Sequence, residues 1–275
     1  MPIIPNWGDR AKLVQTTGRS PSIARAKPSI MLRATDQNLW VAEQPFRYFG
    51  LGIGTRMTVV RLGSDELVVI SPIQVSEALA GELDALGTVA HIIAPNLYHY
   101  RFAAECKAAY PGATFWATAG LRVKRPELAI DRAICHRQGF ANAADAVSPW
   151  PGLEYLFFDG FKTLAPSGPD PLEEWVFFHS ASRTLILTDT AFCFDESFPW
   201  LTQLVTKVGG GYKYLSPSLL ERVATTEKAK VKAAVEQVLG WDFERVIVGH
   251  GRVVDRDGKA QFKRGYENFL GCSLR

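Results

Sequence analysis

Short β-type runs alternate with helix-type segments along much of this chain, and this alternation constrains the fold more than any other feature. The apolar runs Glu66–Ile70 and Ala90–Ala94 lie on either side of a helix-period segment, Val75–Leu86. This order is a β-α-β unit, and a right-handed crossover allows both strands to lie in one sheet. A second cycle follows, with Phe102–Tyr110 as helix and Thr114–Ala117 as strand. The pattern predicts an α/β fold.

Further strands are predicted on both sides of this region: Leu39–Ala42, Arg56–Leu62, Leu153–Phe158, Glu174–Phe178, Thr184–Leu187 and Arg245–Val248. A turn-like segment joins Glu174–Phe178 to Thr184–Leu187, so these two strands are expected to pair as an antiparallel hairpin. Helices are predicted over Glu227–Leu239, which a glycine ends, and over Lys259–Leu270. Residues 126–150 show no periodicity and are predicted to be irregular.

Charge is distributed unevenly over the 275 residues, whose net charge is +3. Residues 1–33 hold six basic residues against one acid, so the remainder is slightly acidic. The remainder shows no interleaving of basic and aromatic residues, which argues against a nucleic-acid-binding protein. Residues 1–30 are expected to form a basic, flexible extension, with an organelle-targeting segment as the alternative. Residues 31–275 are expected to form a single domain.

The four cysteines are widely scattered: Cys106, Cys135, Cys193 and Cys272. They form no CxxC pair, so neither a zinc knuckle nor a disulfide framework is indicated, and a reducing, cytoplasmic compartment is expected. No stretch approaches the roughly 20 consecutive apolar residues that a membrane helix needs. The chain is therefore expected not to span a membrane, and its oligomeric state stays open.

Two predicted strand ends carry residues that suggest a shared site. The segment Leu185–Phe192 places Asp189 after a strand, and the segment Val246–Gly251 places His250 after another. Both segments resemble the metallo-β-lactamase superfamily, in which the first strand ends in a metal-bridging Asp and the second in a His. The resemblance implies an αββα sandwich, in which two mixed sheets are flanked by helices, with a two-metal site in a groove at the strand ends.

The main metal motif of that superfamily is missing here. Its HxHxDH motif lies after a strand and at the start of a helix, which corresponds to residues 94–102. Aligned without gaps, Asn96 and Tyr98 replace the first two histidines, Tyr100 replaces the aspartate and Arg101 replaces the third histidine. The resemblance therefore implies a degenerate metal site.

Several segments are similar to one uncharacterised subfamily, a domain of unknown function within that superfamily: Trp40–Glu43, Arg56–Leu62, Ser71–Pro72, Ala94–Asn96 and Phe178–Leu185. The resemblance covers roughly residues 31 to 270. It implies the fold much more than any activity, because one fold hosts many functions.

Asp189 and His250 still match metal ligands, but a tight zinc site needs three or four donors. We therefore assign no metal ligands and expect no cofactor, or one weakly held ion. The candidate catalytic residues are His250, Asp189 and His99. Each has a structural alternative, since an Asp at a strand end is often a turn former and a His between glycines often satisfies local backbone. The candidate substrate-binding residues are Asn96, Tyr98, Tyr100 and Arg101.

A third ligand is sought in the loop before the strand at Glu174. Asp170 is nearest in an ungapped count, with Glu173 and Glu174 as alternatives, although acids in such loops are more often solvated. His179, at a hairpin turn, is more often structural than functional. Arg101 is expected to pair with Asp189, because a fixed cation at a former ligand position repels a divalent ion and can neutralise the carboxylate.

Three functions remain open from these residues. The first is a metal-independent pocket protein that binds an unknown small molecule, with His–carboxylate acid–base chemistry if it is a hydrolase. The second is a non-enzymatic interaction module. The third is a mononuclear metal-dependent hydrolase that uses Asp189, His250 and a loop carboxylate. No GxSxG elbow marks a nucleophile, and the substrate cannot be read from the sequence.

Overall fold

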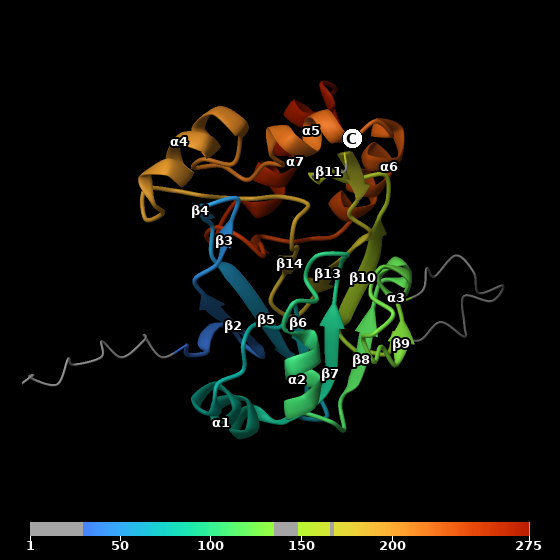
Figure 1. Ribbon diagram of the computed structural model, residues 1–275. Coiled ribbons are helices and arrows are strands. Elements are labelled where there is room, and N and C mark those ends of the chain that lie inside the picture. Colours follow the sequence, from blue (N-terminus) through green and yellow to red (C-terminus); the bar gives the residue numbers. More distant parts are fainter. Residues whose placement is uncertain (1–29, 135–147, 166–167, 275) are drawn as a thin grey trace, which may run out of the picture.

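The computed structural model describes residues 30–134, 148–165 and 168–274. In these residues the larger sheet has seven strands in the order β1-β2-β5-β6-β7-β8-β9 (Figure 1). They are β1 (Arg33–Asp36), β2 (Leu39–Gln44), β5 (Thr55–Arg61), β6 (Glu66–Ile70), β7 (Thr88–Ala94), β8 (Thr114–Ala117) and β9 (Arg132–Ala133). Neighbours pair antiparallel from β1 to β6 and parallel from β6 to β9, so the sheet is mixed.

The second sheet has four strands in the order β10-β13-β14-β15. They are β10 (Leu153–Phe158), β13 (Glu174–His179), β14 (Thr184–Ile186) and β15 (Arg245–Ile247). β14 and β15 are parallel, whereas the other neighbours are antiparallel, so this sheet is mixed as well. Two small hairpins complete the described strands: β3 (Arg47–Tyr48) with β4 (Leu51–Gly52), and β11 (Lys162–Ala165) with β12 (Gly168–Pro171).

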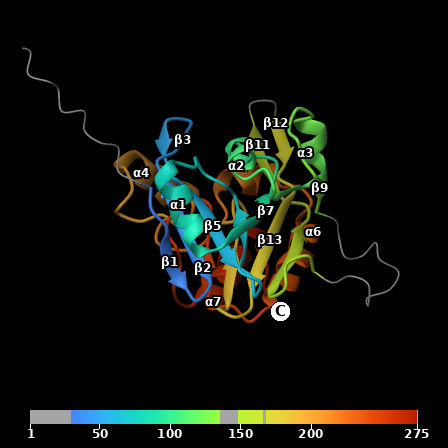
Figure 2. The ribbon, with the colours of Figure 1, turned by 90° about the horizontal axis from the view of Figure 1, so that it is seen from below.

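Helices cover the outer faces of both sheets (Figures 1 and 2). The described helices are α1 (Glu77–Leu86), α2 (Ala103–Ala109), α3 (Ala119–Lys124), α4 (Trp200–Gly209), α5 (Leu219–Ala224), α6 (Lys228–Leu239) and α7 (Gly258–Leu270). α1 and α2 contact β7 of the larger sheet, while α6 contacts β10 and α7 contacts β15 of the smaller one. The layers therefore follow the order helix, sheet, sheet, helix.

The space between the two sheets is filled by apolar side chains from both. Val60 and Ile93 of the larger sheet meet Phe177, Ile186 and Ile247 of the smaller one, and each is at most 1% exposed. Two further apolar clusters lie under the helices, one on each outer sheet face. Such burial is the main favourable contribution to folding. The predicted αββα sandwich is confirmed.

The predicted supersecondary units are also present. β6 and β7 pair in parallel on either side of α1, and β13 and β14 form the expected antiparallel hairpin. Strand β1, the β3–β4 and β11–β12 hairpins and helices α3, α4 and α5 were not predicted from the sequence. Residues 126–150 were expected to be irregular, but Arg132–Ala133 forms β9. The expected extension at residues 1–30 and Cys135 lie outside the described residues, apart from residue 30.

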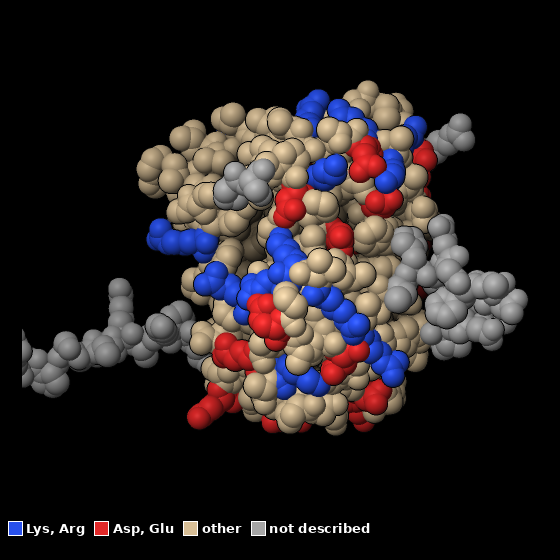
Figure 3. Space-filling model, turned by 45° about the vertical axis from the view of Figure 1, so that its right-hand side comes forward, with Lys and Arg blue, Asp and Glu red and all other residues tan. Residues whose placement is uncertain are grey.

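Charged residues of both signs are interspersed over the lower half of the face that Figure 3 shows. A diagonal row of Lys and Arg crosses the middle of this face, with Asp and Glu beside it. Among the described residues, no helix is both long enough and apolar enough to cross a membrane.

Candidate functional site

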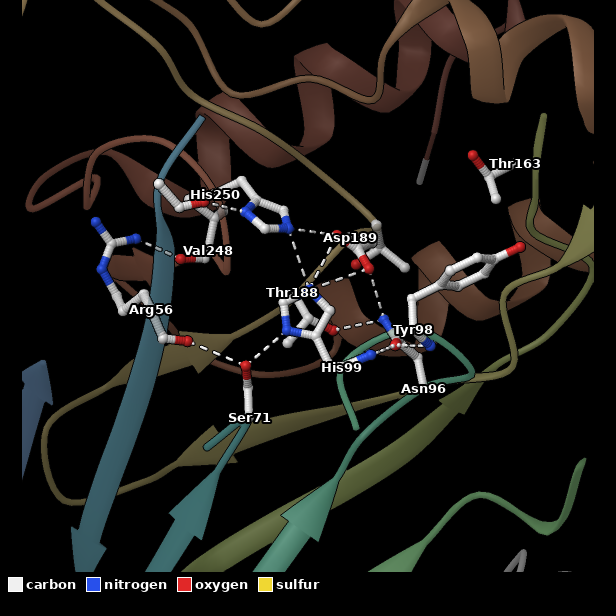
Figure 4. Close-up of polar contacts among 12 residues, drawn as sticks. Arg56, Ser71, Asn96, Tyr98, His99, Thr163, Thr188, Asp189, Val248 and His250 are labelled. Atoms are coloured by element: carbon white, nitrogen blue, oxygen red, sulfur yellow. Dashed lines mark hydrogen bonds and ion pairs between the residues drawn. The ribbon is translucent and has the colours of Figure 1, made fainter. Parts of the chain in front are cut away.

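Three strand ends deliver polar residues to one site, as the sequence predicts. Asn96 follows β7, Asp189 follows β14 and His250 follows β15 (Figure 4). The Asn96 side-chain amide donates a hydrogen bond to Asp189 Oδ2 at 2.9 Å, and His250 Nε2 lies 3.3 Å from Asp189 Oδ1. The predicted convergence is confirmed, whereas the catalytic roles of these residues stay predictions.

His99 completes a cluster with Asp189 and His250. Its Nε2 lies 3.2 Å from Asp189 Oδ1 and 3.2 Å from His250 Nε2. In the described part of the chain this is the group of His, Cys, Asp and Glu side chains whose ligand atoms are close enough to hold a metal ion. The side chains are only 7%, 15% and 8% exposed. The sequence matches Asp189 and His250 to metal ligands, and the structure places His99 beside them as a third possible donor.

Both histidines have their Nδ1 atoms committed to hydrogen bonds away from the cluster. His250 Nδ1 lies 2.6 Å from the carbonyl oxygen of Gly54, which can only accept, so Nδ1 carries the proton. His99 Nδ1 lies 2.6 Å from Ser71 Oγ. The Ser71 hydroxyl donates its proton to the carbonyl oxygen of Arg56 at 3.1 Å, so Ser71 accepts from His99 Nδ1. Each neutral histidine therefore directs an unprotonated Nε2 into the cluster.

The lone pairs of His99 Nε2, His250 Nε2 and Asp189 Oδ1 consequently face one another. Three facing lone pairs repel, so a positively charged species is needed between them. A proton is one solution. Burial alone lowers the pKa of His99, but the negative charge of Asp189 and the hydrogen bond to it outweigh burial, so the pKa is raised. Burial conversely favours a higher pKa for Asp189, but the two histidines outweigh it and hold the pKa of this carboxyl well below its usual range. The carboxylate is therefore ionised and attracts a cation.

A divalent metal ion is the other solution, and the donors fit it. Zinc binds histidine nitrogen and carboxylate oxygen at about 2.0–2.1 Å, and tetrahedral geometry then separates neighbouring donors by about 3.3 Å. The separations between the two Nε2 atoms and Oδ1 are 3.2, 3.2 and 3.3 Å. A hydrogen bond from the second nitrogen of a ligating histidine is also typical of zinc sites, and both histidines have one.

Asn96 and Glu174 hold the loops that carry this cluster. Asn96 Oδ1 accepts hydrogen bonds from the backbone N–H groups of Tyr98 and His99 at 2.9 and 2.8 Å, which orients the His99 loop. Glu174 is 0% exposed and accepts from the backbone N–H groups of Thr188 and Asp189 at 2.8 and 2.7 Å. Asn96 is fully buried too, so the expected contact with substrate does not fit, and its role is to position other residues.

Arg56 fixes the loop that carries His250. Its guanidinium is 4% exposed and donates to the carbonyl oxygens of Val248 and Gly251, on either side of His250. Gly249 is required for close packing in the same loop. A Cβ added there would lie 2.9 Å from His99 Cε1, closer than real Cβ atoms approach, and 3.0 Å from the Thr188 carbonyl oxygen, which is also a tight contact. The Gly-His-Gly sequence therefore lets the two histidines meet.

A cavity of about 520 Å³ opens beside the cluster, and all three cluster residues line it. Its walls are mainly aromatic and apolar, and they include the substrate-binding candidates Tyr98, Tyr100 and Arg101. A ligand pocket commonly combines such walls with a few polar groups that fix orientation. The arrangement can bind an organic molecule against the His–Asp–His cluster.

The predicted pairing of Arg101 with Asp189 is wrong. Asp189 pairs with the two histidines instead. The Arg101 side chain is exposed, and its guanidinium carbon lies 5.7 Å from the centre of the Phe46 ring and 5.9 Å from that of Phe102. The arginine therefore lies at the wall of the cavity, not in the space between the histidines.

The other candidate ligands lie elsewhere. Asp170 accepts from the Tyr98 hydroxyl and forms an ion pair with Lys124 at 3.1 Å, outside the cluster. Glu173 accepts from Gly120 N at 2.9 Å at the start of α3. His179 is 5% exposed and lies 2.7 Å from Ser182 Oγ, so its role is structural, as is usual for a hairpin histidine.

Sequence reasoning missed the residues that support the cluster. Ser71 carried one local signal, since a polar residue directly follows the apolar strand Glu66–Ile70. Arg56 carried another, because it is a charged residue beside a run of apolar strand residues. Neither signal identifies the partner, since Arg56 and Val248 are 192 positions apart in the sequence.

Comparison with known proteins supports the fold and identifies a family. Similar solved structures include a metallo-β-lactamase from Pontibacter korlensis, with 11% identity and a TM-score of 0.57, covering 88% of this chain and 99% of that chain. The metallo-β-lactamase FIM-1 from Pseudomonas aeruginosa in its mono-zinc form matches with 10% identity and a TM-score of 0.54, over 88% and 96%. The Flv1 flavodiiron core from Synechocystis sp. PCC6803, described as metal-soaked, matches with 13% identity and a TM-score of 0.56, over 88% and 61%. At these identities the likeness shows the fold alone.

No curated protein matches this sequence. Residues 36–210, more than half of the chain, match the family described as "Domain of unknown function (DUF4336)". The chain has the metallo-β-lactamase-like fold and belongs to this DUF4336 family.

Proposed function

We propose that this protein is a mononuclear metal-dependent hydrolase, with His99, Asp189 and His250 as the metal ligands. The observation that supports this most strongly is the hydrogen bonding of the two histidines. Their Nδ1 atoms are committed to Gly54 and Ser71, so both Nε2 lone pairs and one carboxylate oxygen point at a common centre. FIM-1, which shares the fold, has been solved in a mono-zinc form, so this fold can hold a single ion.

The proposal modifies the expected degenerate site. The HxHxDH positions are indeed occupied by Asn96, Tyr98, Tyr100 and Arg101. One histidine between them, His99, nevertheless reaches the centre because Asn96 folds the preceding loop around its own side chain. Loss of the motif therefore removes most of a two-metal site and leaves three donors for one ion.

The residues of the chain have separable tasks in this proposal. A bound divalent ion supplies Lewis-acid chemistry: it polarises a carbonyl or phosphoryl oxygen and lowers the pKa of a water molecule. Hydrogen bonds from Nδ1 to Ser71 Oγ and the Gly54 carbonyl oxygen orient His99 and His250 so that each Nε2 faces the ion. Asp189 supplies the negative charge, and Glu174 and Asn96 keep its loop in place.

The cavity suggests the general chemistry of the substrate. Aromatic walls next to the cluster suit an apolar or aromatic body. Arg101 also lines the cavity, and within the described residues it forms no ion pair, so its guanidinium is free to bind an anionic group. We therefore propose an ester, amide or phosphoester whose body is apolar and which carries a negative charge.

Metal content tests the proposal directly. Purified protein is incubated with zinc, passed through a desalting column and analysed for metal, and zinc binding to the apoprotein is measured by titration calorimetry. We expect about one equivalent for the wild type and a large loss for His99→Gln and Asp189→Asn. The control is Asp170→Asn, which removes a carboxylate outside the cluster and should leave zinc binding unchanged. No zinc binding by the wild type, or equal binding by His99→Gln, would refute the proposal.

A metal-independent acid–base site is the second candidate, and the raised pKa of His99 favours it. A proton held between His99 and Asp189 satisfies the same lone pairs without an ion. The two candidates differ in one measurement. A hydrolase of the second kind keeps its activity after chelation, whereas the mononuclear enzyme loses it and recovers it when zinc is added back.

A further inference from the structure

Helix α4 is amphipathic in the reverse sense, because its apolar side chains face outward. Trp200 is 73% exposed and Val208 is 79% exposed, while Leu201, Leu204 and Val205 between them are each more than 40% exposed. At 100° per residue, these five positions occupy one side of the helix. A surface helix of a globular protein normally turns this side toward the core.

The inner side of α4 is instead polar. Thr202 and Thr206 are buried, at 0% and 9% exposed. The Thr202 hydroxyl donates to the carbonyl oxygen of Gly52 at 3.0 Å, and the Thr206 hydroxyl donates to the carbonyl oxygen of Thr202 at 2.8 Å. The first bond joins the helix to the β3–β4 hairpin, whereas the second lies within the helix. The buried polar side therefore faces the protein and the apolar side faces solvent.

Two neighbouring segments extend this apolar area. In α5, Leu219, Leu220 and Val223 are 46%, 47% and 66% exposed, and in the β3–β4 hairpin Phe49 is 71% exposed. The segments adjoin α4, since a Cβ at Gly210 would lie 3.1 Å from the Pro217 carbonyl oxygen and Thr202 bonds to Gly52. We call these exposed residues of α4, α5 and the hairpin the apolar surface. Figure 3 shows a largely uncharged area at the upper left of the molecule, where α4 lies.

Within the segment that carries α4 and α5 the exposed charged residues have one sign, and the exposed acid Glu196 lies just before it. Between residues 197 and 226 the exposed charged residues are Lys207, Lys213 and Arg222, whereas the single acid, Glu221, is 5% exposed. Lys213 is paired with Glu196 just outside this segment at 3.1 Å. Lys207 lies over the Tyr212 ring and Arg222 points outward, so neither is neutralised within the segment. The surface combines exposed aliphatic and aromatic groups with unpaired cations.

From this combination we infer that the apolar surface docks the protein on a membrane that contains anionic lipid. Helices that lie in the membrane interface have Trp, Leu and Val on one side and Lys or Arg beside them. The cations add attraction for the negative surface of the bilayer. A contiguous apolar surface of this kind on a protein usually marks an interaction site.

A second copy of the chain is a poorer occupant for the same reason. A twofold contact brings a surface against its own copy, so Lys207 and Arg222 of both copies would bring four cations into one interface. Within this surface there is no exposed acid to offset them. A lipid headgroup layer supplies the missing negative charge.

The apolar surface borders the cavity next to the His–Asp–His cluster. Tyr48 of the β3–β4 hairpin is 37% exposed and lines the cavity, and Glu221 of α5 lines it too. A protein docked through α4 and α5 would therefore have one wall of its cavity at the bilayer. The docking itself does not depend on a metal or on hydrolysis, so it can be tested separately from the proposed function.

The test is cosedimentation with vesicles of phosphatidylcholine, with and without phosphatidylglycerol. We expect the wild type to sediment with the anionic vesicles, and to be released by added salt. The double variant Trp200→Ser/Val208→Ser should bind at least tenfold more weakly, since the two side chains are the most exposed of α4. Lys207→Gln/Arg222→Gln should weaken binding to the anionic vesicles by roughly fivefold or more per cation.

Two controls separate docking from general effects. Val123→Ser removes an apolar side chain that is 85% exposed on α3, away from the apolar surface, and should bind like the wild type. Arg132→Gln/Arg256→Gln removes two other exposed cations and should have little effect. The substituted residues are all exposed, so thermal melts should stay close to that of the wild type. Failure of the wild type to bind either kind of vesicle would overturn the inference, as would undiminished binding by Trp200→Ser/Val208→Ser. A concentration-dependent dimer that this double variant abolishes would also overturn it, in favour of a second copy.

Discussion

Glu174→Gln is the substitution that best tests how the cluster is held. The two side chains have almost the same shape, so the change replaces one carboxylate oxygen by an amide NH₂ and leaves the volume unchanged. Glu174 Oε2 accepts from Asp189 N at 2.7 Å and from the Asn96 amide at 3.0 Å. Glu174 Oε1 accepts from Thr188 N and from the Thr190 hydroxyl, both at 2.8 Å. Whichever oxygen becomes NH₂, it then faces two or more donors.

The magnitude follows from the donors that lose an acceptor. Leaving one buried donor unsatisfied costs about 1–3 kcal/mol, so two of them cost about 2–6 kcal/mol. Removing a buried negative charge offsets part of this, so we expect the free energy of unfolding to fall by an amount near the lower end of this range, about 2 kcal/mol. The Asp189 loop should also shift, and zinc affinity should fall with it.

Urea denaturation in the presence of a chelator measures the stability change without a contribution from metal. The matched control is Glu173→Gln at the adjacent position, where a less buried acid accepts from Thr118 Oγ1 and Gly120 N at 2.9 Å. Loss of that cap should cost about 1 kcal/mol. If Glu174→Gln proved no more destabilising than Glu173→Gln, the buried carboxylate would not be holding the loop as argued.

Four further predictions concern single residues. Ser71→Ala should weaken zinc binding about 10- to 100-fold in calorimetry, because it removes the hydrogen-bond partner of Nδ1 that orients the His99 ring. Unchanged affinity would contradict the assignment of a proton to His99 Nδ1. Gly249→Ala should destabilise the domain by about 1–3 kcal/mol and weaken zinc binding, since the new methyl group overlaps His99; an unchanged melt would show that the loop can relax. Burial lowers the pKa of His179, so the folded protein favours the neutral imidazole. The stability that this histidine contributes to the fold is fully present above the unfolded pKa of about 6.5, and it is lost as the pH falls through the lowered folded pKa. Urea midpoints should therefore drop more steeply below pH 6.5 for the wild type than for His179→Asn, and parallel profiles would rule this out. Arg101→Ala should change the free energy of unfolding by less than about 0.5 kcal/mol in thermal or urea melts, in contrast to the larger loss that a buried pair with Asp189 would have required.

The fold could be predicted from the sequence because its main elements follow local rules. The apolar strands and the α1 and α6 helices have the periodicity and the glycine or serine boundaries of their class. Helices α4 and α5 were missed because their apolar side chains face solvent and polar side chains face the core. Sequence-based prediction assumes the opposite arrangement. Glu221 illustrates this, since this charged residue of α5 is buried and the flanking Leu220 is exposed.

All three members of the cluster are candidate catalytic residues in the sequence, but only Asp189 and His250 could be matched to metal ligands, and the reason is physical. Asp189 and His250 are each set by a strand end, so the sheet order alone places them together. The position of His99 depends on a turn, in which Asn96 Oδ1 accepts hydrogen bonds from the backbone N–H groups of Tyr98 and His99. This turn changes which side chain faces the centre, and an ungapped alignment does not contain that information. Asn96 stands at the position of a lost ligand, and from that position it brings a different histidine to the centre. A residue that replaces a ligand can thus preserve the site through the backbone, so the missing motif is weaker evidence against metal binding than the sequence comparison implies.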